Sequence, residues 1–298
     1  MKVLSLIKRN CKLFFKDKGM FFTSLITPVI LLVLYATFLA NVFRESFVSN
    51  LNGAIEVPDK LVNATVGGEL VSSLLAVSCI TVAFCSNMLM VQDKVSGSFK
   101  DLTMAPVKRS TLAVSYYVAT FISTFIVNFV AMALSLTYLA VNGWYLSAAD
   151  VFLMLLDVVI LVMFGTALSS IINLFLSSQG QISAVGTIVS AGYGFVCGAY
   201  MPISSFSKGL QYVISCLPGT YGTSLIRNHA LAGVFREMSD TGFPETVIES
   251  IKDSIDCNIY FFANKVSVSG MYFVMLATVF LLLGVYVLLS VLLSKRRG

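Results

Sequence analysis

Residues 91–110 read VQDKVSGSFKDLTMAPVKRS, a short charged stretch between two long apolar runs at residues 67–90 and 111–141. Its basic residues are Lys94, Lys100, Lys108 and Arg109. Loops rich in Lys and Arg between membrane spans stay in the cytoplasm. The stretch therefore predicts a cytoplasmic hairpin at the membrane surface, and the apolar runs on either side predict membrane-spanning helices.

The hairpin contains its own helix signals. Gly97 can end one helix, Ser98 can cap the next, and Pro106 prevents that helix from continuing. Phe99 and Leu102 lie three residues apart and so share one face of the short helix. The hairpin is either a plain turn between two spans or a contact point for a soluble partner.

The same residues resemble a motif of the ABC transporter type-2 permeases, the membrane subunits of many ATP-binding-cassette exporters. The family motif reads acid–base–acid–x–Gly–Thr–Leu–x–x–Leu–x–x–x–Pro–Val, and here Val95 replaces the second acid, Ser98 the Thr and Phe99 the first Leu. The resemblance implies that this hairpin couples the chain to a separate ATPase subunit. The coupling residues that it implies are Asp93, Lys94, Gly97, Ser98, Phe99, Leu102 and Pro106.

Composition indicates an integral membrane protein. The chain of 298 residues is 57% hydrophobic and 12% charged, whereas a soluble domain carries about a quarter charged residues. One His and six scattered Cys give no clustered metal-ligand spacing, and no phosphate-binding Gly-x-x-x-x-Gly-Lys-Ser/Thr motif occurs. We therefore expect no cofactor in this chain, no nucleic-acid partner, and ATP with Mg²⁺ only on a partner ATPase.

The hydropathy pattern predicts an all-α fold with six transmembrane helices in one domain, residues 1–298. A basic amphipathic helix over residues 2–18 would lie in the membrane interface, as a topology anchor, as the connecting helix of the resembling family, or as both. The predicted spans are residues 20–42, 67–90, 111–141, 150–177, 182–200 and 271–293. Basic residues gather at both chain ends and in the hairpin. We therefore expect a multi-pass protein of a bacterial plasma membrane with both termini in the cytoplasm.

Two outer segments follow from this threading, residues 43–66 and residues 201–269. In the second, one run of residues resembles the outer re-entrant helices that follow span five in the same permease family. The run is Pro202, Pro218, Tyr221, Arg227 and Gly233. The helix-capable segments are Ser205–Cys216, Gly219–Ala232 and Glu245–Asp256. Cys216 and Cys257 both fall in this outer segment, where oxidation is permitted, and are candidates for a disulfide.

The fifth predicted span carries a stripe of small residues, spaced by four: Gly186, Ser190, Gly194 and Gly198. Small side chains let two helices approach closely in lipid. The stripe either packs within one subunit or forms a seam between subunits or the lining of a passage.

Three polar residues within predicted spans are candidates for a passage: Ser78, Asn87 and Asp157. A serine hydroxyl in a helix can instead bond its own backbone. An ionisable residue at the depth of Asp157 is costly and rarely faces lipid. It therefore either reaches the outer interface or a polar neighbour, or acts as a gate.

The sequence favours a non-enzymatic permease subunit of an ABC exporter, which uses ATP hydrolysed by a partner. The implied partners are an ATPase, in two copies or as a pair, a second permease copy or paralogue, and the lipid bilayer. We expect the substrate to be an amphipathic or lipid-like molecule. Two alternatives remain, an ion-coupled transporter that uses Asp157 and an intramembrane hydrolase, for which His229 is the lone His.

Overall fold

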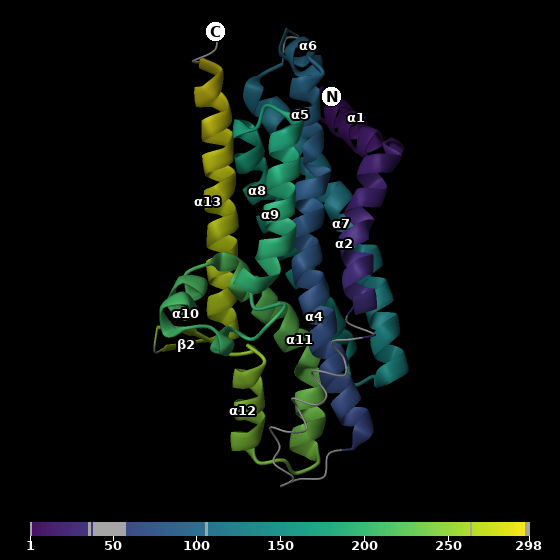
Figure 1. Cartoon of the computed structure of the whole chain (residues 1–298), viewed down its shortest axis with the longest axis vertical. Helices are drawn as coiled ribbons and strands as arrows, with labels where there is room; N and C mark the ends of the chain where they lie inside the picture. Colours follow the sequence, from purple (N-terminus) through teal and green to yellow (C-terminus); the bar gives the residue numbers. More distant parts are fainter. Residues whose placement is uncertain (1, 35–36, 38–57, 105–106, 263, 296–298) are drawn as a thin grey trace.

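The computed structural model of the chain describes residues 2–34, 37, 58–104, 107–262 and 264–295. Long helices form an elongated bundle, with both chain ends and the short helix α6 at the same end (Figure 1). The helices are α1 (Lys2–Lys16), α2 (Lys18–Leu34), α4 (Asp59–Ser86), α5 (Met88–Val95), α6 (Ser98–Met104), α7 (Arg109–Asn142), α8 (Ala148–Phe175), α9 (Gln179–Val196), α10 (Lys208–Ser215), α11 (Pro218–Asp240), α12 (Glu245–Ser254) and α13 (Val268–Lys295). A short 3₁₀ turn, Ile203–Ser205, precedes α10. The prediction of an almost entirely α-helical protein is confirmed.

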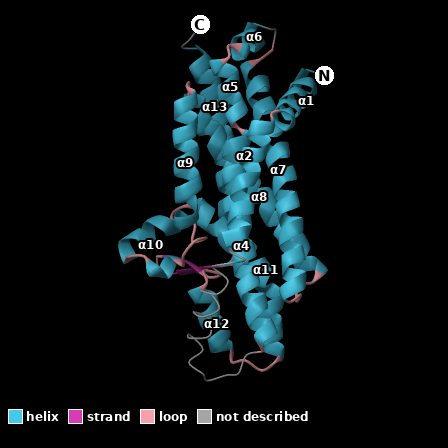
Figure 2. Ribbon diagram, turned by 45° about the vertical axis from the view of Figure 1, so that its right-hand side comes forward, coloured by secondary structure: helices cyan, strands magenta, loops and turns pink. Residues whose placement is uncertain are grey.

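The strands that the structure describes form one small antiparallel hairpin before α13. Strand β1 (Ile259–Phe261) pairs with β2 (Asn264–Val266), with Ile259 opposite Val266. The hairpin lies beside α10 (Figure 2).

The central element is the continuous helix made by α4 and α5. It runs for 37 residues, and 94% of its most apolar 18-residue stretch is buried. The helices that surround it are α2, α7, α8, α9 and α11. At 1.5 Å per residue its length is about 55 Å, well beyond the ~30 Å of hydrocarbon in a bilayer. The expectation of an outer loop over residues 43–66 is therefore wrong for residues 59–66, which are helical.

We name the end of the bundle at α12 the outer end and the end at α6 the inner end (Figure 1). The outer end of α4 is helical because it has a hydrophobic partner. Leu61 and Val62 are buried in a cluster with Leu231 and Val234 of α11 and Ile248 of α12. This second core lies apart from the main core around the middle of α4. A third cluster, at the inner end, joins α1, α2, α5 and α7.

Among the residues that the structure describes, four helices are long and apolar enough to cross a membrane: α4 with α5, α7, α8 and α13. The pair α1 and α2 would make a fifth span, although it is bent by 73°. Most of the predicted first span beyond Leu34 lies outside the described residues. Helix α9, the predicted fifth span, ends at Val196 rather than residue 200 and is not among the four, since its 18 residues include two Gln and four Gly.

The outer segment contains both helices of the pair that we expected, with different bounds, and their re-entrant position stays a prediction. Helix α10 is short, but α11 continues past Ala232 to Asp240 and packs along α4, α8 and α13. Most residues of α11 between Gly219 and Met238 are buried. The tertiary contacts along this face extend α11 beyond the length that its own sequence pattern suggested. Helix α12 begins at Glu245, as predicted.

Candidate functional site

The predicted hairpin is present as two short helices joined at Gly97. This residue has φ +84°, a left-handed backbone conformation that glycine adopts without steric cost. Helix α6 follows and exposes Lys100, Asp101 and Met104, the last with 79% of its surface exposed. The predicted stop at Pro106 lies outside the described residues.

Asp93, one of the predicted coupling residues, is buried at the base of the hairpin. Its carboxylate accepts two hydrogen bonds from Arg9 of α1, at 2.7 and 3.1 Å, and one from the hydroxyl of Tyr116 of α7, at 2.5 Å. Asp93 itself is 5% exposed. It therefore fastens α5 to α1 and α7 and offers little surface to a partner protein.

Lys94 is also directed into the chain. Its Nζ donates to the carbonyl oxygens of Asn173, Leu174 and Leu176 at 2.7, 3.0 and 3.1 Å. These carbonyls end α8, where a helix carries partial negative charge and a cation is favourable. Lys94 therefore fastens α5 to the inner end of α8.

Phe99 and Leu102, which we expected on the partner-facing side of α6, are only half-exposed. Both pack against the inner hydrophobic cluster. The Phe99 ring stacks on Tyr116 with 6.5 Å between ring centroids, and the Arg109 guanidinium lies 5.8 Å from the Phe99 centroid. Ser98 is half-exposed beside them. Contact of this helix with an ATPase stays a prediction, and its fully exposed side is that of Lys100, Asp101 and Met104.

Asn87, a predicted passage residue, joins three helices where α4 passes into α5. Its Nδ2 donates to Ser169 and Ser170 of α8, both at 3.0 Å, and its Oδ1 accepts from Thr120 of α7 at 3.3 Å. Ser78, a second predicted passage residue, is fully buried in α4. Both lie inside the bundle of this chain, not on its outer surface.

Asp157, the third predicted passage residue, has polar neighbours on two other helices. Its carboxylate lies 2.5 Å from Nδ1 of His229 on α11 and accepts a hydrogen bond of 2.5 Å from the hydroxyl of Tyr272 on α13. Seven residues earlier on α8, Asp150 pairs with Arg236 of α11. Since Arg236 also lies seven residues from His229, the two acid–base pairs set the antiparallel register of α8 and α11.

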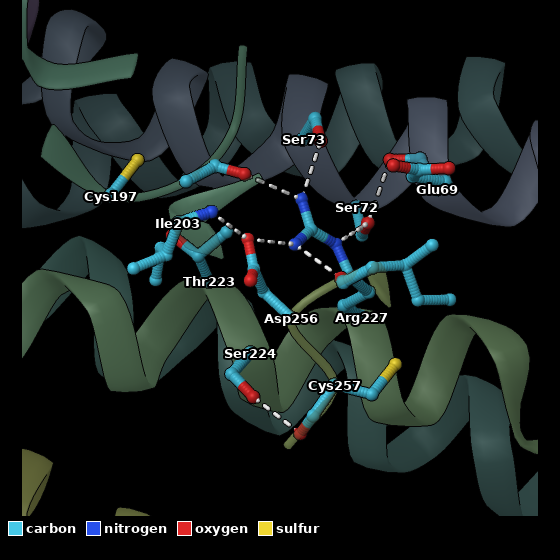
Figure 3. Close-up of polar contacts among 12 residues, drawn as sticks. Glu69, Ser72, Ser73, Cys197, Ile203, Thr223, Ser224, Arg227, Asp256 and Cys257 are labelled. Atoms are coloured by element: carbon cyan, nitrogen blue, oxygen red, sulfur yellow. Dashed lines mark hydrogen bonds and ion pairs between the residues drawn. The ribbon is translucent and has the colours of Figure 1, made fainter. Parts of the chain in front are cut away.

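A buried arginine at the outer end holds four segments together (Figure 3). Arg227 of α11 donates to Ser73 of α4 at 3.0 Å, to the carbonyl of Gly198 at 2.9 Å and to the carbonyl of Ile255 at 2.6 Å. The carboxylate of Asp256 lies 3.6 Å from the guanidinium. These bonds join α4, the end of α9, α11 and the turn after α12.

Asp256 closes this cluster on the loop side. It accepts a hydrogen bond of 2.9 Å from the backbone N–H of Ile203. Burial raises the pKa of its carboxyl to about 6, opposed by the nearby charge of Arg227. Glu69 of α4 is a second buried carboxylate in the same region (Figure 3).

The small-residue stripe is largely occupied by this chain itself. A Cβ at Gly186 would lie 3.3 Å from Met88 of α5, and one at Gly194 would lie 2.2 Å from the ring of Tyr200. Gly198 lies beyond the end of α9 in a turn with φ +71°. Ser190 is half-buried. The stripe is thus not one continuous helix face, because the chain folds back over its outer half.

The candidate disulfide is not formed, and all six cysteines are free. Cys216 is exposed at the end of α10, whereas Cys257 is buried in the second core, 1% exposed. Burial raises the pKa of the Cys257 thiol to about 12, which leaves it protonated and unreactive.

The buried partners of three arginines, Arg9, Arg227 and Arg236, were not predicted from the sequence. One signal for Arg9 was available: the other basic residues of α1 are lysines. Arginine forms two parallel bonds to a carboxylate, which lysine cannot do. Its partner Asp93 could not have been identified, because 84 residues separate the two.

Apolar spanning helices and an anchored hairpin at one end of the bundle define this chain as a multi-pass membrane protein. A family model described as ABC-2 type transporter matches residues 1–230. The chain therefore belongs to the ABC-2 type transporter family and is the permease component of an ABC transporter. Permeases of this family work with an ABC ATPase. A search among curated proteins gave no match.

Proposed function

We propose that the chain is the membrane subunit of an ABC exporter, driven by ATP that a separate ATPase subunit hydrolyses. One observation carries the proposal: the hairpin presents an exposed tip while its base is bonded to three other helices. Met104 and Lys100 are exposed at the tip, whereas Asp93 and Lys94 bind inward. Such a hairpin can transmit a movement of a protein outside the membrane to the helices of the bundle.

The contacts define how that movement would spread. A displacement of α6 would move α5 and α4 together, because α4 and α5 form one continuous helix. Asp93 carries it to α1 and α7, and Lys94 carries it to the end of α8. The inner halves of these helices would therefore move together, while Gly97 lets α6 tilt on the ATPase surface.

For topology we propose six spans, with α9 as the fifth. Both termini would lie on the cytoplasmic side of a bacterial plasma membrane. Basic residues at the inner end support this orientation. So does the position of α6, which lies at the same end of the bundle as both chain ends (Figure 1). Helix α1, with its basic and apolar faces, would lie along the inner interface.

A second permease, either another copy or a paralogue, would complete the passage. Much of α9 is exposed in this chain, and Ser183, Ala184 and Thr187 lie on its exposed side. Small residues let two helices approach closely in lipid and so favour helix association. An amphipathic or lipid-like substrate is the class that we propose for the passage.

An ion-coupled transporter is the second candidate, and the observation that favours it is the buried pair of Asp157 and His229. The two proposals differ in their energy source. The purified complex, reconstituted with its ATPase and presented with a panel of lipid-like compounds, should transport one class only when ATP is hydrolysed. Transport that continues with a hydrolysis-deficient ATPase and follows an ion gradient would overturn the exporter proposal.

A further inference from the structure

A small cavity lies near the inner end of the bundle, where α1, α4 and α7 meet. It has a volume of about 10 Å³, measured as the space open to the centre of a water molecule. That is about the smallest cavity that holds one water. All the residues that line it are buried, among them Asn10, Ser86 and Tyr116.

Two polar atoms at this cavity have no protein partner: Nδ2 of Asn10, on α1, and Oγ of Ser86, on α4. Two further hydroxyls of the lining have partners. The Tyr116 hydroxyl donates to Asp93, and the Thr120 hydroxyl donates to Asn87. A buried polar group without a partner is unfavourable in a setting from which bulk water is excluded. The two orphan atoms therefore point to a small polar ligand between them.

The lining selects the occupant. Amide N–H and hydroxyl groups face the cavity and none of its lining residues is a carboxylate, so a bound cation would lack counter-charge. The volume is too small for a phosphate or for a segment of a lipid chain. We propose that a single water molecule binds here, accepts a hydrogen bond from Asn10 Nδ2 and hydrogen bonds to Ser86 Oγ.

The water site extends the hairpin's anchor into the central helix. Asn10 Oδ1 already accepts a bond of 2.9 Å from Arg9, and Arg9 holds Asp93. The water adds the missing step from Asn10 to Ser86. Helix α1 is then joined to α5 by an ion pair and to α4 by a water bridge.

The first test is a structure of the assembled transporter in lipid, at a resolution that shows ordered water. We expect a density peak within hydrogen-bonding distance, about 2.6–3.3 Å, of both Asn10 Nδ2 and Ser86 Oγ. An empty cavity, or a protein or lipid group in that place, overturns the proposal.

The second test is a double-mutant cycle on the same complex, read as melting temperature. Asn10→Leu fills the cavity and leaves Ser86 without a partner, and Ser86→Ala removes one partner of the water. We expect the double variant to melt more than about 2 °C above the value that adding the two single losses gives. Strictly additive losses overturn the bridge.

Ser115→Ala is the matched control. Ser115 is equally buried, but its hydroxyl donates to the Leu112 carbonyl of its own helix at 2.7 Å. Combined with Asn10→Leu, it should give additive losses, which would show that the coupling belongs to Ser86.

Discussion

Arg9 and Asp93 lie 84 residues apart in the chain and form a two-point ion pair at 2.7 and 3.1 Å. This pair ties the first helix to the base of the hairpin. It implies that the acidic residue of the family-like motif acts inside the permease, as a link between helices. The exposed side of α6 is left to contact a partner.

We expect Asp93→Ala to uncouple ATP hydrolysis from transport. The change leaves Arg9 and the Tyr116 hydroxyl without their acceptor and should cost about 2 kcal/mol of stability. Melting temperature and substrate-stimulated ATPase activity of the complex measure both effects. Asp101→Asn on the exposed side of α6 is the control for stability. Normal coupling in Asp93→Ala would show that the pair has no part in transmission.

Two glycines of α9 should respond differently to enlargement. A side chain at Gly194 meets the Tyr200 ring, so Gly194→Leu should impair folding of the single chain. Gly192 has nothing of its own chain within 4 Å of a Cβ, so Gly192→Leu should leave folding intact and weaken association of two permeases. Size-exclusion chromatography of the membrane subunit measures both. Unchanged association in Gly192→Leu would place this face against lipid.

The two acid–base pairs between α8 and α11 should differ in importance because they differ in burial. Asp157→Leu leaves His229 and the Tyr272 hydroxyl without their partner and should cost about 3 kcal/mol of stability. Arg236 is half-exposed, so Arg236→Gln should cost about 0–1 kcal/mol. Thermal unfolding of the purified protein compares them. Equal losses would contradict the ranking by burial.

Asp256 predicts a pH dependence of the outer segment. Because burial raises its pKa from an ordinary value of 3.8 to about 6, the folded chain binds this proton more tightly than the unfolded chain. Its contribution to stability is therefore complete below pH 4 and is lost as pH rises towards 6. The loss is at most about 3 kcal/mol.

Asp256→Asn keeps an acceptor for the Ile203 N–H and suits the left-handed backbone at this position, φ +55°. Melting curves between pH 4 and 7 should therefore flatten in this variant. An unchanged profile would mean that another group dominates this range.

The spans were predictable where apolar residues run without interruption, as in α7 and α8. The pattern failed at the outer end of α4, since Leu61 and Val62 are helical only because α11 and α12 cover them. The hairpin and Gly97 could be read from local turn chemistry. The partners of Asp93, Asp157 and Arg227 could not, because each lies on a helix distant in sequence.

The small-residue stripe shows a second limit. A spacing of four residues predicts one helix face only while the helix continues, and α9 ends at Val196, before Gly198. Tyr200 then returns over Gly194. No local signal in the sequence shows that the chain turns back at this point.

The central claim, that the tip of the hairpin docks on an ATPase, is tested most directly by site-specific crosslinking. A photo-crosslinking residue at Met104, which is 79% exposed, should capture the ATPase subunit in the assembled transporter. The same residue at Val141, which is 83% exposed near the opposite end of α7, should not. ATPase adducts from position 104 alone are the predicted result. Their absence from position 104 in a complex that still transports with ATP, or their appearance from position 141, would contradict the account.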